Sequence, residues 1–150
     1  MICAFICLLC LAGCDRESKT VAMDLNFEAS QVQKVEMYHY IDSPASAEKK
    51  VITDPKDIQS LYAKFQGLKM ENKQLAATPS SAEVTSFRFL LEDGTNFELI
   101  YYGYGVKNGE LCFSPSNHRL FTAADIGWNW RWLNEDLEAV PAGWQELPQS

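Results

Sequence analysis

Several short stretches between residues 33 and 113 alternate apolar and polar side chains, which is the period of a half-buried β-strand. The clearest stretch is 33–41, whose two faces carry Val35, Met37, His39 and Ile41 against Lys34, Glu36, Tyr38 and Tyr40. Residues 49–53 predict a short returning strand, and residues 68–70 predict the start of another. Because His39 lies on the apolar face, we expect a hydrogen-bonded core or edge histidine rather than a ligand.

Residues 54–67 follow the helical period instead. Their apolar side chains fall at i, i+3, i+4 and i+7, which makes one stripe of Ile58, Leu61, Tyr62 and Phe65. Asp54 can cap the free N–H groups of the first turn, and Pro55 suits the first helical position. Gly67 supplies a left-handed C-terminal cap. The pattern predicts an amphipathic helix that packs on a sheet.

Residues 83–102 predict a hairpin whose register can be argued. The two apolar rows are Thr85, Phe87, Phe89 and Leu91, and Thr95, Phe97, Leu99 and Tyr101. A two-residue turn at Asp93-Gly94 would place the rows on opposite faces of the sheet. A three-residue loop, Glu92-Asp93-Gly94, pairs Phe89 with Phe97 and needs a left-handed third residue, for which Gly94 is suited. We therefore predict that loop, with a bulge at Gly94.

The remaining chain predicts a second hairpin and a mixed C-terminal region. A two-residue turn at Asn108-Gly109 would pair Tyr104 with Phe113 and Val106 with Leu111. Residues 114–120 predict a loop. The stretch Thr122-Ala123-Ala124-Asp125 resembles a capping box at which a helix could start, although Gly127 weakens it, and Trp128, Trp130 and Trp132 alternate as in a strand. Residues 133–140 predict a helical turn or two ended by Pro141, before an irregular tail. Adjacent hairpins indicate an α+β fold: a single domain in which one or two helices cover one face of an antiparallel sheet.

The N-terminus predicts export and lipidation. Residues 2–11 form an uncharged apolar run of roughly the length of a signal-peptide core, whereas a membrane span needs ~20 residues. Leu11-Ala12-Gly13-Cys14 resembles the bacterial lipobox. That resemblance implies cleavage before Cys14 and lipid on the new N-terminal cysteine, which would anchor the protein in a membrane. The missing basic residues at 1–3 leave a buried apolar N-terminal helix as the alternative.

These assignments divide the chain into a signal peptide at 1–13, a lipidated cysteine and spacer at 14–30, and an α+β extracytoplasmic domain at 31–150. Asp15 resembles the signal that keeps a lipoprotein in the inner membrane of Gram-negative bacteria, facing the periplasm. Segments 51–67 and 87–102 loosely resemble small, uncharacterised bacterial surface lipoproteins. This second resemblance implies no known activity.

Composition narrows the possible partners. The chain has 13 basic and 20 acidic residues, which argues against binding to nucleic acid. Cys3, Cys7 and Cys10 have a C-x3-C-x2-C spacing that resembles the iron–sulfur loop of radical-SAM enzymes, but they lie in the segment that cleavage would discard. We therefore expect no cofactor. Cys112 would be the one thiol left beside Cys14, and its place in a predicted strand indicates a small buried side chain.

No catalytic motif is present. The sequence has no G-x-S-x-G, no H-E-x-x-H and no paired cysteines or calcium-loop spacing for a metal. A hydrolase is the enzymatic alternative, and it would require His39 or His118 to lie in a cleft with a carboxylate and a serine. We expect a non-enzymatic binding or protein-interaction domain.

Aromatic residues supply the candidate ligand site. Tryptophan and tyrosine offer flat faces with a polar edge, which suit sugar rings and protein contacts. Asn129 and Arg131 lie between the tryptophans and could supply polar contacts. The alternatives are that these rings form the core, or that they rest at the membrane interface beside the anchor. The candidate residues for glycan or cell-wall binding are Tyr102, Tyr104, Trp128, Asn129, Trp130, Arg131 and Trp132.

Overall fold

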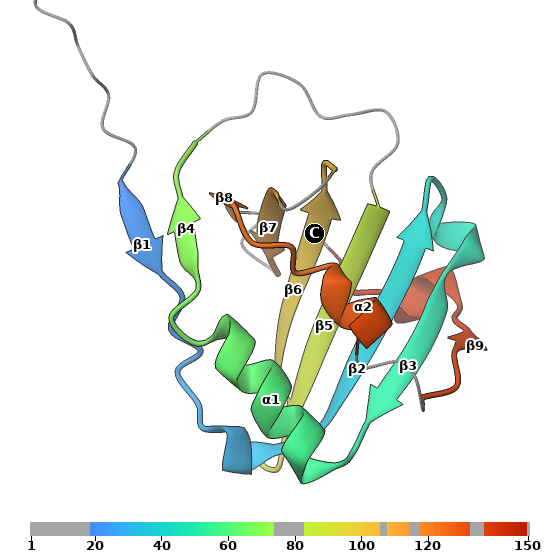
Figure 1. The fold of residues 1–150 in the computed structure, drawn as a ribbon. Helices are drawn as coiled ribbons and strands as arrows, with labels where there is room; N and C mark the ends of the chain where they lie inside the picture. The colour runs from blue at the N-terminus through green and yellow to red at the C-terminus, as the bar shows by residue number, and fades with distance from the viewer. Residues whose placement is uncertain (1–18, 74–82, 106–107, 115–117, 133–136, 150) are drawn as a thin grey trace, which may run out of the picture.

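One antiparallel sheet organises the molecule (Figure 1). The computed structural model describes residues 19–73, 83–105, 108–114, 118–132 and 137–149. Over these residues nine strands follow the order β1-β4-β8-β7-β6-β5-β2-β3-β9. Their bounds are β1 Thr20–Ala22, β2 Val32–Ile41, β3 Glu48–Ile52, β4 Lys69–Glu71, β5 Glu83–Leu91, β6 Asn96–Gly103, β7 Gly109–Phe113, β8 His118–Thr122 and β9 Val140–Pro141. The predicted antiparallel sheet is confirmed, and the fold is richer in strand than expected.

The helices are short. The α-helices of the described residues are α1, Pro55–Phe65, and α2, Trp128–Trp132. Three 3-10 turns join the elements: η1 Ala29–Gln31, η2 Pro44–Ser46 and η3 Trp144–Glu146. The predicted helix is confirmed in α1, where the Asp54 carboxylate accepts the Lys56 N–H at 2.8 Å. Its buried side chains are Ile58, Leu61 and Phe65.

The first hairpin has the predicted register. Phe89 pairs with Phe97, and Phe87 pairs with Leu99. The Gly94 N–H donates to the Leu91 carbonyl at 3.0 Å, and Gly94 has a φ of 84°. The three-residue loop therefore forms as expected, because a left-handed glycine closes it without moving either apolar row off the core face.

The predicted register of the second hairpin is wrong. Gly109 pairs with Gly103, and Leu111 pairs with Tyr101, so the connection is longer than two residues. Gly109 lies in β7, where a side chain is excluded because a Cβ would lie 2.3 Å from the Tyr102 carbonyl oxygen and 2.5 Å from the Tyr101 ring. The observed register also keeps Leu111 on the same face as Tyr101, which the predicted pairing did not.

Residues 20–30, expected as part of a spacer, are built into the domain. Strand β1 pairs with β4 at one edge of the sheet. Met23 and Leu25 are buried in the main core, and the Phe27 ring lies 5.7 Å from the Phe89 ring. The described part of the predicted spacer therefore contributes structure, because its isolated apolar side chains have a core to enter.

The chain enters the sheet at the end where β5 begins. Pairing across β1, β4, β8, β7, β6 and β5 links residues that form one row. Figure 1 shows the start of β1 and the start of β5 at the same end of the sheet. The row consists of Thr20, Glu71, Phe121, Glu110, Tyr102 and Val84.

Residues 118–141 differ from prediction in three places. Residues 118–120, the end of the predicted loop, belong instead to β8, which pairs along β7. The tryptophan stretch forms helix α2 rather than a strand, because Asp125 caps it by accepting the Trp128 N–H at 3.1 Å. Residues 133–136 of the predicted helical turn lie outside the described residues, and its end is not helical, since residues 137–139 have no regular structure and β9 begins at Val140.

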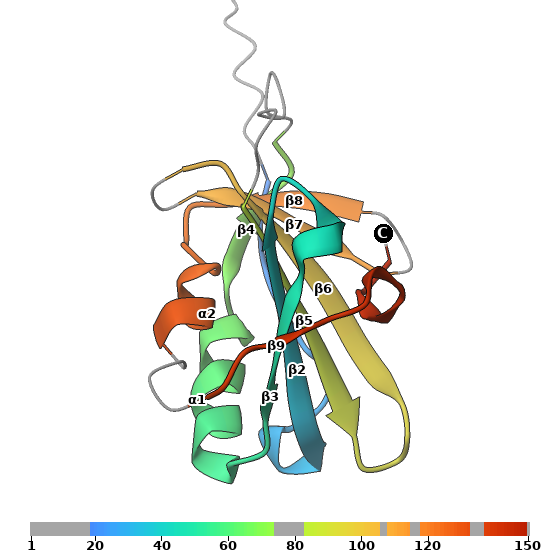
Figure 2. The ribbon, with the colours of Figure 1, turned by 90° about the vertical axis from the view of Figure 1, so that its right-hand side faces the viewer.

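Two faces of the sheet carry different contacts. Figure 2 shows α1 and α2 on one side, which we call the helix-covered face, and the C-terminal segment crossing towards the other, the second face. Strand residues on the helix-covered face join the helices in the main core. The second face holds two smaller buried clusters, one of which contains Cys112, a buried thiol as predicted. The fully buried strand residues of the main core include Val35, Met37, Phe87, Phe89, Leu99 and Leu111.

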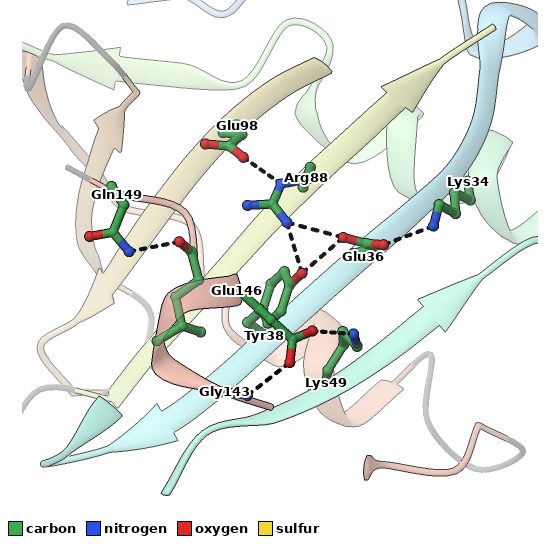
Figure 3. A network of polar contacts seen from close by, with 10 residues as sticks. Lys34, Glu36, Tyr38, Lys49, Arg88, Glu98, Gly143, Glu146 and Gln149 are labelled. Carbon is green, nitrogen blue, oxygen red and sulfur yellow. Dashed lines mark hydrogen bonds and ion pairs between the residues drawn. The ribbon is translucent and has the colours of Figure 1, made fainter. Parts of the chain in front are cut away.

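Arg88 is the centre of a polar network on the second face (Figure 3). Its guanidinium donates to Glu98, to Glu36 at 3.2 Å and to the Tyr38 hydroxyl at 2.9 Å. Tyr38 in turn donates to Glu36 at 2.8 Å. Burial raises the pKa of Glu36, but hydrogen bonds from Lys34, Tyr38 and Arg88 outweigh it and leave that pKa below its usual value. Ion pairs and hydrogen bonds of this network therefore link the neighbouring strands β2, β5 and β6.

Candidate functional site

A cavity of about 480 Å³ opens where helix α2 lies over the ends of β5 and β6. It combines an indole ring, a guanidinium and two carboxylates with a nearly bare backbone wall, since three of its lining residues are glycines. This mixture of apolar and convergent polar groups is the usual make-up of a ligand pocket. The lining residues are Glu83, Tyr101, Gly103, Gly105, Asp125, Gly127, Trp128 and Arg131.

Helix α2 is too short to be stable alone, and its neighbours hold it in place. The Lys64 ammonium from α1 donates to the Asn129 side-chain oxygen at 2.9 Å. The Lys50 ammonium from β3 lies 4.2 Å from the Trp130 ring centre and donates to the Trp130 carbonyl at 3.5 Å. Burial lowers the pKa of both lysines. These contacts fix α2 at its C-terminal turn, where a cation complements the helix dipole.

Among the described side chains of α2, those of Trp128 and Arg131 are exposed. Trp128 is 52% exposed. The Arg131 guanidinium lies 3.2 Å and 3.4 Å from the two carboxylate oxygens of Glu83, with 59% of its side chain exposed. An ion pair this exposed adds little to stability. The cavity rim can therefore exchange partners at small cost.

His39 lies behind the cavity. Its ring stacks on Trp130 with centroids 5.1 Å apart, and its Nε2 lies 3.6 Å from Glu83. Burial lowers the pKa of His39, and the negative charge of Glu83 offsets only part of that effect. The Thr85 hydroxyl lies 3.4 Å from Nδ1 of His39, and Thr85 is fully buried.

The structure separates the candidate ligand residues predicted from the sequence. Trp128 and Arg131 line the cavity, whereas Trp130 and Asn129 are buried behind it. Alternate positions of a helix point in nearly opposite directions, which explains why Trp128 and Trp130 do not form one platform.

Tyr102 and Tyr104 contact other groups. Tyr102 packs on the second face beside Arg119, and the Tyr104 hydroxyl donates to Glu110 at 2.8 Å. The structure therefore does not bring Tyr102 and Tyr104 to the cavity that Trp128 and Arg131 line. The side chain of Trp132, and all of Cys14, lie outside the described residues.

Glu83, Tyr101 and Asp125 line the cavity, but none of them is among the ligand residues predicted from the sequence. Asp125 could have been found, because it stands three residues before Trp128 at the spacing of an N-terminal cap. Glu83 and Tyr101 come from strands far from α2 in sequence, and they reach the cavity only through the sheet register, in which Thr85 pairs with Tyr101. Burial, and then the nearby Asp125 carboxylate, raises the pKa of Tyr101.

No protein-family model, curated protein or solved structure matches this chain. Within the described residues, no helix has the length and apolar character needed to cross a membrane. The same residues contain no group of three or more His, Cys, Asp or Glu side chains placed to hold a metal. The cavity and the lipobox-like N-terminus are therefore the two features of the chain that bear on its function.

Proposed function

We propose that this chain is an extracytoplasmic lipoprotein, anchored through lipid on Cys14, whose domain binds a ligand without catalysing a reaction. The cavity beside α2 is the observation that carries the binding role, because it joins the half-exposed Trp128 to charged groups from β5, from the loop before α2 and from α2 itself. Asp15 favours the inner membrane, with the domain facing the periplasm, in a Gram-negative host.

The anchor is tested by replacing the cysteine. Cys14→Ser in the full chain should abolish incorporation of labelled palmitate and release the protein from the membrane fraction. Cys112→Ala is the matched control, because that thiol is buried in β7 and should leave labelling unchanged. A Cys14→Ser protein that stayed labelled and membrane-bound would contradict the proposal.

A glycan or another cell-envelope molecule is the ligand class that the Trp128 face favours. Sugar rings stack on exposed indole, and planar carboxylate and guanidinium groups such as those of Asp125 and Arg131 bond their hydroxyls. Trp128→Ala should weaken binding of cell-wall fragments to the full chain roughly tenfold. Trp144→Ala is the control, because Trp144 is 62% exposed but lies outside this cavity. Equal effects of the two substitutions would argue against the α2 cavity.

A further inference from the structure

The cavity beside α2 carries more negative than positive charge. Glu83 and Asp125 each contribute a carboxylate, and among the described lining residues Arg131 contributes the one cation. His39, which lies behind Glu83, is mostly neutral at pH 7 because burial holds its pKa below the ordinary value of about 6.5. The chain as a whole has a net charge of −7. An anionic ligand is therefore opposed by the charge of the site, and a cation is favoured.

The protein already places a cation in this site. Arg131 contacts both oxygens of Glu83, at 3.2 Å and 3.4 Å, from a largely exposed side chain. Because exposed ion pairs are weak, another cation can displace the guanidinium and leave it to solvent. Arg131 thus acts as an internal occupant that a ligand would replace.

The remaining walls suit a cation as well. Trp128 is half exposed in the cavity, and indole is the aromatic ring that attracts cations most strongly. Gly103, Gly105 and Gly127 leave the backbone bare, so the space beside the ring is open. At Gly127 an added Cβ would lie 3.3 Å from the Tyr101 ring and 3.5 Å from Asp125, so these two groups lie close to the bare backbone.

We propose that the cavity binds a protonated amine, which rests against the Trp128 ring and pairs with Glu83 and Asp125 in place of Arg131. This inference rests on the proposed ligand-binding role of the cavity and names the chemistry of its ligand. An amino sugar and an aliphatic diamine both carry the required ammonium group, and the choice of probes separates these two sources.

Arg131 distinguishes an amine from a neutral sugar. A neutral sugar would use the guanidinium as a hydrogen-bond donor, so removal of Arg131 would weaken its binding. An amine competes with the guanidinium for Glu83, so the same substitution should strengthen its binding. The two ligand classes therefore predict opposite signs for one variant.

Calorimetry on the full chain in detergent micelles, at low salt and near neutral pH, tests the proposal. The probes are a glucosamine oligomer with free amines, its N-acetylated counterpart and cadaverine. We expect the free-amine oligomer to bind and the acetylated one to bind at least tenfold more weakly. Trp128→Ala and Asp125→Asn should weaken binding roughly fivefold to tenfold, and Arg131→Gln should strengthen it roughly threefold. Asparagine caps helices as well as aspartate does, so Asp125→Asn isolates the charge.

Trp144→Ala and Arg119→Gln are matched controls away from the cavity, and they should leave affinity unchanged. Binding of cadaverine, or its competition with the oligomer, supports the proposal and shows that the amine suffices; binding of the free-amine oligomer alone supports it with an amino sugar as the source. Equal binding of both oligomers, or weaker binding by Arg131→Gln, overturns the amine but retains the proposed binding role. Failure of all three probes overturns the amine, and the proposed binding role fails with it only if cell-wall fragments also show no dependence on Trp128.

Discussion

The helix-covered face and the second face of the sheet solve the same problem by different means. On the helix-covered face, fully buried rings such as Phe65, Phe87 and Phe89 pack edge to face with centroids 4.9–5.8 Å apart. On the second face, Arg88 joins carboxylates on the two neighbouring strands. The helix-covered face buries one large apolar core, whereas the second face combines two small apolar clusters with charge pairs. Ring packing on the helix-covered face can therefore supply stability, while charge pairs on the second face align the strands.

Removing one aromatic ring from each face measures how much each face contributes to the free energy of unfolding. Phe87→Ala should lower the free energy of unfolding by about 3–5 kcal/mol, because Phe87 is fully buried and its loss leaves a cavity. Phe121→Ala, at a half-buried position of the second face, should cost about 1 kcal/mol. Urea denaturation of both variants measures the difference. Equal costs would mean that the second face has a core of the same kind.

Arg88→Met tests the charge network. It leaves Glu36 and Glu98 without their shared cation, and we expect a loss of about 1–2 kcal/mol of unfolding free energy. Adding Glu36→Gln and Glu98→Gln should recover most of that loss, since the carboxylates then need no cation. Denaturant titration of the single and triple variants checks both expectations. A triple variant no more stable than Arg88→Met would indicate that Arg88 acts through packing on Tyr38.

His39, on the helix-covered face, makes the stability of the fold depend on pH. Its pKa is lower in the folded state than the unfolded value of about 6.5, so the unfolded chain binds the proton more readily. The stability that neutral His39 contributes is therefore present above pH ~6.5 and is lost as the pH falls below it. Thermal unfolding of the wild type and His39→Asn from neutral to mildly acidic pH should show a steeper fall for the wild type. Parallel curves would contradict this prediction.

The smallest effect is expected at the C-terminal segment. Lys49 pairs with Glu146, and the Gly143 N–H donates to the same carboxylate at 2.9 Å. The hydrogen bond from Lys49 holds the pKa of Glu146 below its usual value. Glu146→Gln should speed hydrogen exchange at Ala142, whose N–H donates to the Ala47 carbonyl, with little change in global unfolding. Unchanged exchange at Ala142 would show that burial of Leu147 alone retains the segment.

Local signals explain which elements could be predicted. Helix α1 and the first hairpin follow from residues next to one another in sequence, namely the Asp54 cap and the Gly94 loop. The second hairpin could not be placed because Gly109 is fixed by its contact with the Tyr101 ring, a tertiary effect. The spacing of Trp128 and Trp130 fits a strand as well as a short helix, and the Asp125 cap decides between them.

The site was only half visible in the sequence for a related reason. Aromatic clustering pointed to Trp128 and Arg131, but the same signal included Trp130, which is buried beneath Lys50. Composition shows where rings gather and not which of them face solvent. Glu83 reaches the cavity through strand pairing, and that distance along the chain hid it.

The position of β1 limits how far the domain could lie from a membrane in which a lipid on Cys14 was inserted. Five residues separate Cys14 from Thr20, and they can extend over at most about 20 Å. Thr20 lies at the end of the sheet where β5 begins and the cavity opens. A lipid on Cys14 would therefore confine the cavity to a thin layer above the bilayer. Within such a layer a ligand fixed in the same membrane has an effective concentration on the order of millimolar, so weak intrinsic affinity is enough to hold it.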